Sequence, residues 1–224
     1  MAERAKYLSG IGYILVLIGA MASITKFGGI ITLAGIVLAE IAWILLGRKL
    51  YGKVMIRNGI LMIVSPFLIA GIIIAVLISM SPHISEVSRY GRVDIMPEQI
   101  IHLVSIIALI TLAVIAIGFV SWILHVMSHL RAGNKLAIGT FKYSAYCQIA
   151  SFLISVASLA WLFSNIMKVA PLLQKMTKPN IFVLSNLLGP AFITLMIAGV
   201  ISVVAYVLSI VAFFSIEEIR TLTF

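Results

Sequence analysis

Glu40 is the residue of this chain whose type and position point most directly to chemistry. It lies inside a long apolar stretch, eight residues before Arg48. At the rise of an α-helix, its carboxyl group is about 12 Å from the basic end of that stretch. A carboxylate so deep in a membrane is costly and rarely faces lipid. We expect Glu40 to be protonated, or paired across a helix bundle with a His, Tyr, Ser or Lys side chain.

Two interpretations of Glu40 stay open at this stage. The functional interpretation is a proton or cation site in a transporter or channel, which is the default hypothesis for an acid inside a membrane. The structural interpretation is a neutral acid that is hydrogen-bonded to a neighbouring helix or contacts a partner subunit. No second acid lies inside an apolar stretch, and this favours the structural interpretation.

The histidines are weaker candidates for chemistry. His125 and His129 are spaced i and i+4, so their rings share one face of a helix. Two imidazoles can begin a metal site, but no HExxH motif or third ligand accompanies them, and we interpret them as a pair at the membrane interface. His102 lies at the other end of the same apolar stretch, and His83 lies in a polar segment. A haem needs axial ligands that face it from suitable positions, and these four histidines do not favour such a site.

The sequence also lacks the common signatures of catalysis. It contains no nucleophile elbow, P-loop or dinucleotide-binding fingerprint. Its single cysteine, Cys147, excludes an internal disulfide and any site that needs several thiolates. We therefore predict no catalytic residue, no metal and no cofactor, with bound lipids as the expected ligands. An enzyme is the least favoured class of function.

The composition places these residues in a membrane. The chain is 62% hydrophobic and 10% charged, with a mean hydropathy of +1.21. A soluble domain has about a quarter charged residues and cannot hide this much apolar surface from water. In a bilayer, lipid solvates the outer faces of the helices instead. The net charge of +9 is explained by basic loops that orient helices in the membrane, so we expect membrane lipids as partners and no nucleic acid.

The apolar runs predict an all-α polytopic helical bundle with six transmembrane helices in a single domain, residues 1–224. A spanning helix needs about 20 predominantly apolar residues. The runs that meet this length are 8–25, 27–47, 59–80, 100–127, 143–167 and 191–215. The first run is as long as a span and lacks a signal-peptidase site, so we expect it to be retained.

Two segments between these runs need separate interpretation. Residues 81–99 form the longest polar stretch and are predicted to be a loop, with Pro97 and Glu98 at the start of the next helix. The apolar run 181–216 is longer than one crossing, and Gly189-Pro190 interrupts it. We expect 181–188 to be a short interfacial or half-inserted segment before the last span, with a single kinked helix as the alternative.

The basic residues predict that both termini are cytoplasmic. With the N-terminus inside, ten Lys and Arg residues fall on the cytoplasmic side and six fall outside. The side with more basic residues faces the cytoplasm. Three lysines in the outer segment 168–180 oppose this orientation, so the bias is moderate.

Small residues at helical spacing predict where the helices contact one another, because close packing drives association in lipid. These residues are Gly12, Gly19, Ser23, Gly35, Ala39, Ser151, Ser155, Ala198, Ser202, Ala205 and Ser209. The alternative is that the hydroxyl groups line a polar path. Trp43 and Trp122 each lie near a basic end of a span, and we interpret both as anchors at the headgroup level.

The two ends of the chain resemble a known family. The first two helices read KYLSGIGYILVLIGA and ITLAGIVLAEIAWILLGRKL, and the last helix ends in IVAFFSI. This arrangement is similar to an archaeal family of uncharacterised multi-pass membrane proteins with a middle region of variable length. The resemblance implies a multi-pass protein of the archaeal plasma membrane. It brings no catalytic residue, because the family has no established activity.

Two functions remain in competition. The favoured one is a non-enzymatic accessory or structural subunit of a larger membrane complex, because the chain has many packing faces and little mass outside the membrane. Protein partners would then be expected. The alternative is a small stand-alone transporter or channel for protons, cations or a small solute that uses Glu40. This alternative predicts a polar seam that converges on Glu40.

Overall fold

The structure is a computed structural model in which residues 2–22, 25, 27–90, 97–175 and 181–216 are described. Side chains are described within these ranges except at residues 2, 76–104, 106–107 and 168–188. The described part consists of helices joined by short turns and contains no strand. The six helices are α1 (Ala2–Met21), α2 (Gly28–Lys49), α3 (Lys53–Tyr90), α4 (Pro97–Leu136), α5 (Gly139–Lys175) and α6 (Ile181–Phe214).

Each of the six helices is long and apolar enough to cross a membrane. The all-α class and the six spanning helices predicted from the sequence are therefore confirmed. Large apolar side chains such as Ile11, Phe67, Leu109 and Val200 are exposed on the outer faces, where lipid would cover them. The cytoplasmic location of the termini stays a prediction.

The helices are longer than the apolar runs from which they were predicted. Residues 81–90 continue α3, so they are not part of the predicted loop, and residues 91–96 lie outside the described part. The start of α4 at Pro97 is confirmed. Hydropathy marks where a helix must leave the lipid, but it does not mark where the helix must stop. The polar residues after Met80 continue α3 past Pro82, and the helix ends at Tyr90, just before Gly91.

The predicted break at Gly189-Pro190 is wrong, because α6 is one continuous helix with Pro190 inside it. Proline removes one backbone hydrogen bond from a helix. Interrupting the helix beside lipid would leave several more backbone groups unpaired, so the continuous helix is the less costly state. The hydroxyl of Thr194 bonds to the Pro190 carbonyl at 3.0 Å.

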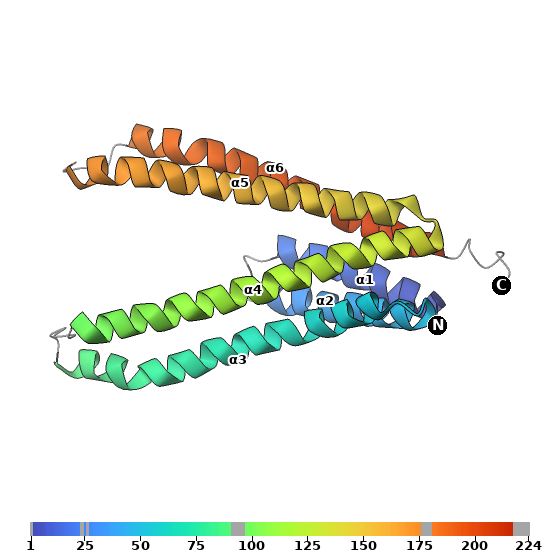
Figure 1. Cartoon of the computed structure of the whole chain (residues 1–224), viewed down its shortest axis with the longest axis horizontal. Helices are drawn as coiled ribbons and strands as arrows, with labels where there is room; N and C mark the ends of the chain where they lie inside the picture. The colour runs from blue at the N-terminus through green and yellow to red at the C-terminus, as the bar shows by residue number, and fades with distance from the viewer. Residues whose placement is uncertain (1, 23–24, 26, 91–96, 176–180, 217–224) are drawn as a thin grey trace.

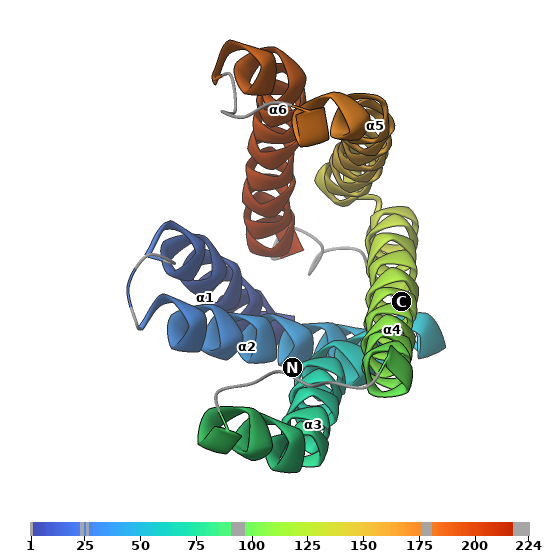
Figure 2. The ribbon, with the colours of Figure 1, turned by 90° about the vertical axis from the view of Figure 1, so that its left-hand side faces the viewer.

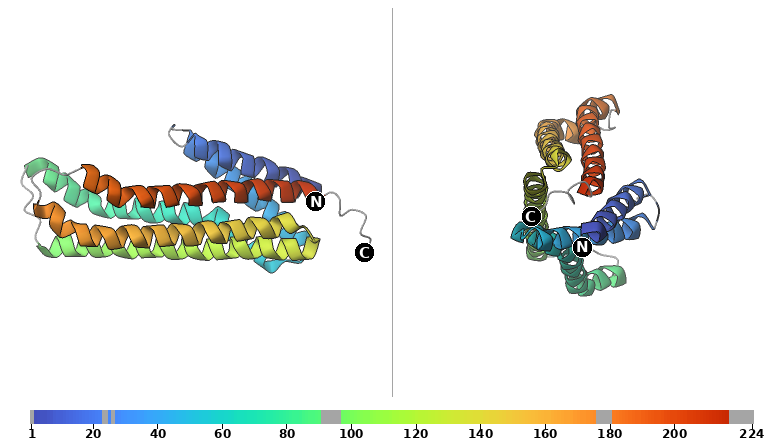
Figure 3. Two further views of the ribbon diagram at one scale, coloured as in Figure 1. Left: turned by 90° about the horizontal axis from the view of Figure 1, so that it is seen from above. Right: turned by 90° about the vertical axis from the view of Figure 1, so that its right-hand side faces the viewer.

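The six helices follow one another around a ring. Each helix contacts its neighbours in sequence, and α6 contacts α1, which closes the ring. Figure 2 shows this order from one end of the molecule. The start of α1 and the end of α6 lie at the opposite end (Figures 1 and 3), where the helices converge. We call this the terminal end, and we call the end toward which α3–α4 and α5–α6 diverge the splayed end (Figure 1).

A hydrophobic cluster holds the terminal end together. Its largest fully buried members are Trp43, Phe141, Phe213, Leu46 and Met55, which come from α2, α3, α5 and α6. The interpretation of Trp43 as a headgroup anchor is therefore wrong. Its neighbours on four other helices remove the indole from any surface, and its ring nitrogen donates to the Tyr13 hydroxyl inside the bundle.

The small residues of α1 and α2 lie at a close helix contact, as their spacing predicts. A Cβ atom added to Gly12 would lie 2.5 Å from the Ala39 nitrogen, and one added to Gly35 would lie 2.6 Å from the Gly12 carbonyl oxygen. A Cβ on Gly19 would meet the backbone of Gly28 at 2.8 Å. Ser23 lies outside the described residues. The glycines let the two backbones touch, which a larger side chain would prevent.

Small residues also join α5 to α6. Ser151 donates a hydrogen bond to the Ala198 carbonyl at 2.8 Å and lies 2.7 Å from the Ser202 hydroxyl. Ala198 and Ala205 are buried in the same contact. Ser155 is half-buried one turn further along α5. These contacts hold α5 against α6 and thereby position the polar side chains that the two helices carry.

Candidate functional site

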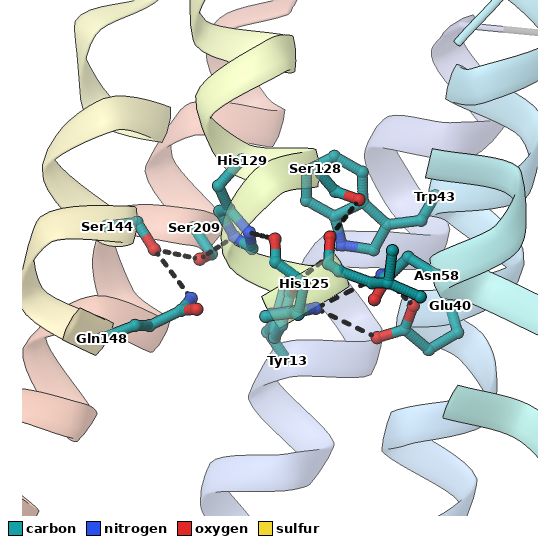
Figure 4. A network of polar contacts seen from close by, with 11 residues as sticks. Tyr13, Glu40, Trp43, Asn58, His125, Ser128, His129, Ser144, Gln148 and Ser209 are labelled. Carbon is teal, nitrogen blue, oxygen red and sulfur yellow. Dashed lines mark hydrogen bonds and ion pairs between the residues drawn. The ribbon is translucent and has the colours of Figure 1, made fainter. Parts of the chain in front are cut away.

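Glu40 is buried where α2, α3 and α4 meet, and its two carboxyl oxygens have different partners (Figure 4). Its side chain is almost completely shielded, with the residue 2% exposed. Asn58 of α3 donates its amide N–H to Oε2 of Glu40 at 3.0 Å. Nδ1 of His125, on α4, lies 3.5 Å from Oε1 of Glu40. A histidine is among the partner types that the sequence predicted for Glu40.

The Glu40–His125 contact can hold one proton in two places. With the proton on Oε1, Glu40 is a neutral acid that faces the lone pair of Nδ1. With the proton on Nδ1, Glu40 is a carboxylate that accepts from the imidazole. With the proton on Oε1, Asn58 has an acceptor at Oε2 of Glu40 and a second acceptor at Nδ1 of His125, 3.4 Å from its amide nitrogen. With the proton on Nδ1, Asn58 keeps only the bond to Oε2, so its position favours the proton on Glu40.

A second branch of the network starts at His129, one turn further along α4. Its Nδ1 lies 3.0 Å from the backbone carbonyl of His125. A carbonyl can only accept, so this nitrogen carries the proton, and Nε2 of neutral His129 is an acceptor. The Ser209 hydroxyl of α6 lies 2.9 Å from Nε2 and 3.0 Å from the Ala205 carbonyl, and both are acceptors for its single proton. The branch thus joins α4 to α6.

Ser144 and Gln148 of α5 extend this branch. The Ser144 hydroxyl donates to the Ala205 carbonyl at 2.9 Å and lies 2.8 Å from the Ser209 hydroxyl. Because the Ser144 proton is directed at a carbonyl, its oxygen accepts the amide N–H of Gln148 at 3.3 Å. Figure 4 shows the whole line of contacts from Gln148 to Glu40.

Aromatic rings surround the two histidines on the terminal side. The Trp43 ring lies 4.7 Å from the His129 ring and 6.1 Å from the His125 ring, measured between centroids. The Trp43 indole N–H donates to the Tyr13 hydroxyl at 2.9 Å. These contacts lock the orientation of the network and separate it from the terminal end of the molecule.

A cavity of about 480 Å³ lies next to the network. All six helices line it, with Val16 of α1, Glu40 of α2, Ser65 of α3, His125 of α4, Gln148 of α5 and Ser202 of α6 among the contributing residues. Its polar lining residues include Glu40, His125, Gln148 and four serines besides Ser202, with Glu40 the one acid among the described lining residues. Ser155 and Ser202, assigned to packing faces from the sequence, both line this cavity.

The cavity lies on the splayed side of Glu40 and His125. On α4, which runs toward the terminal end, the lining residues Gly118 and Ser121 precede His125. On α5, which runs away from that end, Ser151 and Ser155 follow Gln148 in the cavity wall. The hydrophobic cluster lies on the other side of the network. The path through the ring is therefore wide on one side and closed by packed side chains on the other.

Two buried acceptor atoms near the network have no hydrogen-bond partner among the described residues. They are Oδ1 of Asn58 and Oε1 of Gln148. A buried polar atom without a partner is costly, and such atoms in a native site call for a ligand or a water. Gln148 lines the cavity with other atoms of its side chain, since this oxygen is itself buried.

The structure places the predicted histidines differently from the sequence interpretation. His125 is 8% exposed and His129 is fully buried, so the prediction of an interfacial pair is wrong. Burial follows because four other helices pack around the middle of α4 at this level. His102 lies on α4, and its side chain is outside the described part. Within that part, no group of three His, Cys, Asp or Glu residues is placed to hold a metal ion.

The sequence interpretation missed Asn58, Gln148, Ser144 and Tyr13. Asn58 was assigned to a polar loop, because it lies one residue before the predicted span at 59–80. Gln148 carried a usable signal, since an amide inside an apolar run is costly unless it meets a partner. Ser144 and Tyr13 carried none, because either is common on helices of any membrane protein.

Comparisons with known proteins give no further guide to this site. No family model, no curated protein and no solved structure matches the chain.

Proposed function

We propose that this protein is a small membrane transporter that moves a proton or another small cation, or a solute, through its six-helix ring. The observation that carries the proposal is the cavity lined by all six helices, with Glu40 and His125 in its wall. A buried acid inside a membrane marks an ion or proton pathway by default. Here that acid lies 3.5 Å from His125 and lines the cavity.

The network supports a coupling between binding and shape. Glu40 and Asn58 come from α2 and α3, His125 and His129 come from α4, and the branch beyond them reaches α5 and α6. A change of charge at Glu40 alters the contacts that hold these helices against one another. Alternating access needs such a link, because the ligand must bias the equilibrium between two arrangements of the helices.

Proton flux through reconstituted vesicles tests the proposal. Vesicles carry the protein, an interior pH-sensitive dye and a potassium gradient, and valinomycin sets the membrane potential. We expect potential-driven proton uptake above that of protein-free vesicles, and its loss in Glu40→Gln, because the amide cannot carry the proton. The matched control is Glu98→Gln, which makes the same change outside the six candidate spans and should leave the flux unchanged. Flux that persists in Glu40→Gln would refute the proposal.

The accessory-subunit function favoured by the sequence stays a prediction, and the native mass of the protein distinguishes it from transport. Transport predicts that the protein extracted in mild detergent is a monomer or a small homo-oligomer. A stoichiometric assembly with other proteins, identified by mass spectrometry, would favour the subunit instead. The plasma membrane and an archaeal source, implied by the resemblance, also stay predictions.

A further inference from the structure

We propose that the cavity binds an organic cation, namely a protonated amine carried on an apolar body. This inference rests on the proposed function, because it names the class of solute that the transporter would move. Charge, aromatic lining and volume each point to this class.

The charge of the cavity wall favours a cation. Glu40 is the one acid among the described residues that line the cavity, and none of those residues is Lys or Arg. An anion would meet no compensating charge and would face the carboxyl group, which costs free energy in a site of low dielectric constant. A cation would find its counter-charge in Glu40, with Asn58 holding the second oxygen.

The aromatic lining favours a ligand with organic character. Tyr13, Trp122, Phe152 and Tyr206 contribute to the wall from four different helices. Trp122 and Phe152 stack on each other with their centroids 4.2 Å apart. Rings stacked in this way turn their faces toward each other, so they offer apolar surface rather than a cation-binding face. The same rings bury the apolar part of a ligand.

The volume leaves room for a ligand much larger than a bare ion. A cavity of about 480 Å³ falls in the range of sites for drug-sized molecules, about 300 to 1,000 Å³. Val16, Ile36 and Met62 contribute apolar side chains to the cavity wall. They would cover the hydrocarbon of the ligand.

Binding of the amine would exchange with a proton. When the ammonium occupies the cavity, Glu40 is a carboxylate that pairs with it. When the ammonium leaves, one proton takes its place on the Glu40–His125 pair, so the charge of the site is the same in both states. An amine gradient would then drive protons in the opposite direction.

A binding experiment with three probes of similar shape tests the ligand class. Radiolabelled phenylbutylamine is bound to the intact purified protein in detergent, and unlabelled phenylbutylamine, phenylbutanol and phenylbutyrate compete with it. We expect the amine to displace the label at a concentration at least roughly tenfold lower than the neutral or the anionic analogue needs. A hydrogen bond to a charged group contributes about that factor to the affinity. Glu40→Gln should abolish this preference.

A second variant keeps the test decisive if Glu40→Gln does not fold. Gln148→Lys places a positive charge in the cavity wall, so it should weaken phenylbutylamine binding and reverse the preference toward phenylbutyrate. Gln99→Lys makes the same change outside the candidate spans and should have no effect. Equal competition by the three probes in the wild-type protein would overturn the inference.

The outcomes separate this inference from the proposed function. Glu40-dependent proton flux without amine preference would overturn the organic cation and leave the transporter standing. Amine binding that depends on Glu40, with no proton flux driven either by the potential or by a phenylbutylamine gradient, would support the ligand class and overturn transport. Loss of both would remove the two proposals together.

Discussion

At the scale of single residues, the two carboxyl oxygens of Glu40 face side chains from two different helices. Asn58 of α3 fixes Oε2 and His125 of α4 faces Oε1. An acid held only by one neighbour would be a local helix contact. Two partners on two helices make its protonation state a property of the helix packing, and this is what a coupled carrier requires.

Trp43 shows how strongly one residue depends on its surroundings. It contacts Phe213 and His129, with ring centroids 5.1 Å and 4.7 Å away, and donates to the Tyr13 hydroxyl. Trp161 lies on α5 and is 43% exposed. The two tryptophans therefore form a matched pair of buried and exposed positions on spanning helices.

We predict that Trp43→Ala lowers the free energy of unfolding by about 3 to 5 kcal/mol, as expected for a large buried aromatic residue. Trp161→Ala should change it by less than about 0.5 kcal/mol. Chemical denaturation in mild detergent, followed by circular dichroism, measures both. If the two variants lost similar stability, the burial of Trp43 at the centre of the bundle would be contradicted.

At the scale of elements, the contact between α1 and α2 depends on missing side chains. Gly12 and Gly35 face each other, and a Cβ on either would strike the backbone of the other helix. Backbone atoms cannot move aside as a flexible side chain can. The hairpin must therefore open if either glycine is replaced, and Glu40 moves with α2.

Gly12→Ala should destabilise the protein by about 1 to 3 kcal/mol, the usual cost of overpacking a tight contact. Gly71→Ala is the control, because an added Cβ at Gly71 of α3 would meet nothing within 4 Å. Alanine there should be neutral or stabilising by up to about 1 kcal/mol, from its higher helix propensity. Thermal unfolding in detergent checks the order of the two variants, and a reversed order would refute the close contact.

At the scale of the whole molecule, the ring has two unlike ends. The hydrophobic cluster closes the terminal end, and the cavity lies toward the splayed end. A transporter in one state of its cycle has this asymmetry, with a binding site open to one side of the membrane and sealed from the other. The seal is made of packed side chains, so it can open only if the helices rearrange.

Thiol labelling tests which end admits water. In a Cys147→Ala background, Ser155→Cys places a thiol in the cavity wall and Ala212→Cys places one in the buried cluster. A small membrane-impermeant thiol reagent should label position 155 from the side opposite the termini, because only a hydrated thiol forms the reactive thiolate. Position 212 should stay unlabelled. Labelling of position 155 from the side of the termini would contradict the direction in which the cavity opens.

The sequence by itself determined the class of the protein and the number of helices that are long and apolar enough to span a membrane. These follow from hydropathy and spacing along one helix, which are local properties. It also located the glycines of α1 and α2, because small residues at helical spacing mark a contact whatever the partner helix is. It placed helix ends poorly, since the end of an apolar run does not stop a helix.

The tertiary structure alone decided what Glu40 meets and where the cavity lies. Asn58 is 18 residues from Glu40, and Ser209 is 80 residues from His129. Pairings over such separations depend on how each helix is rotated about its axis and on which faces meet. A sequence shows which faces are polar or small, but it does not show which of them the ring brings together.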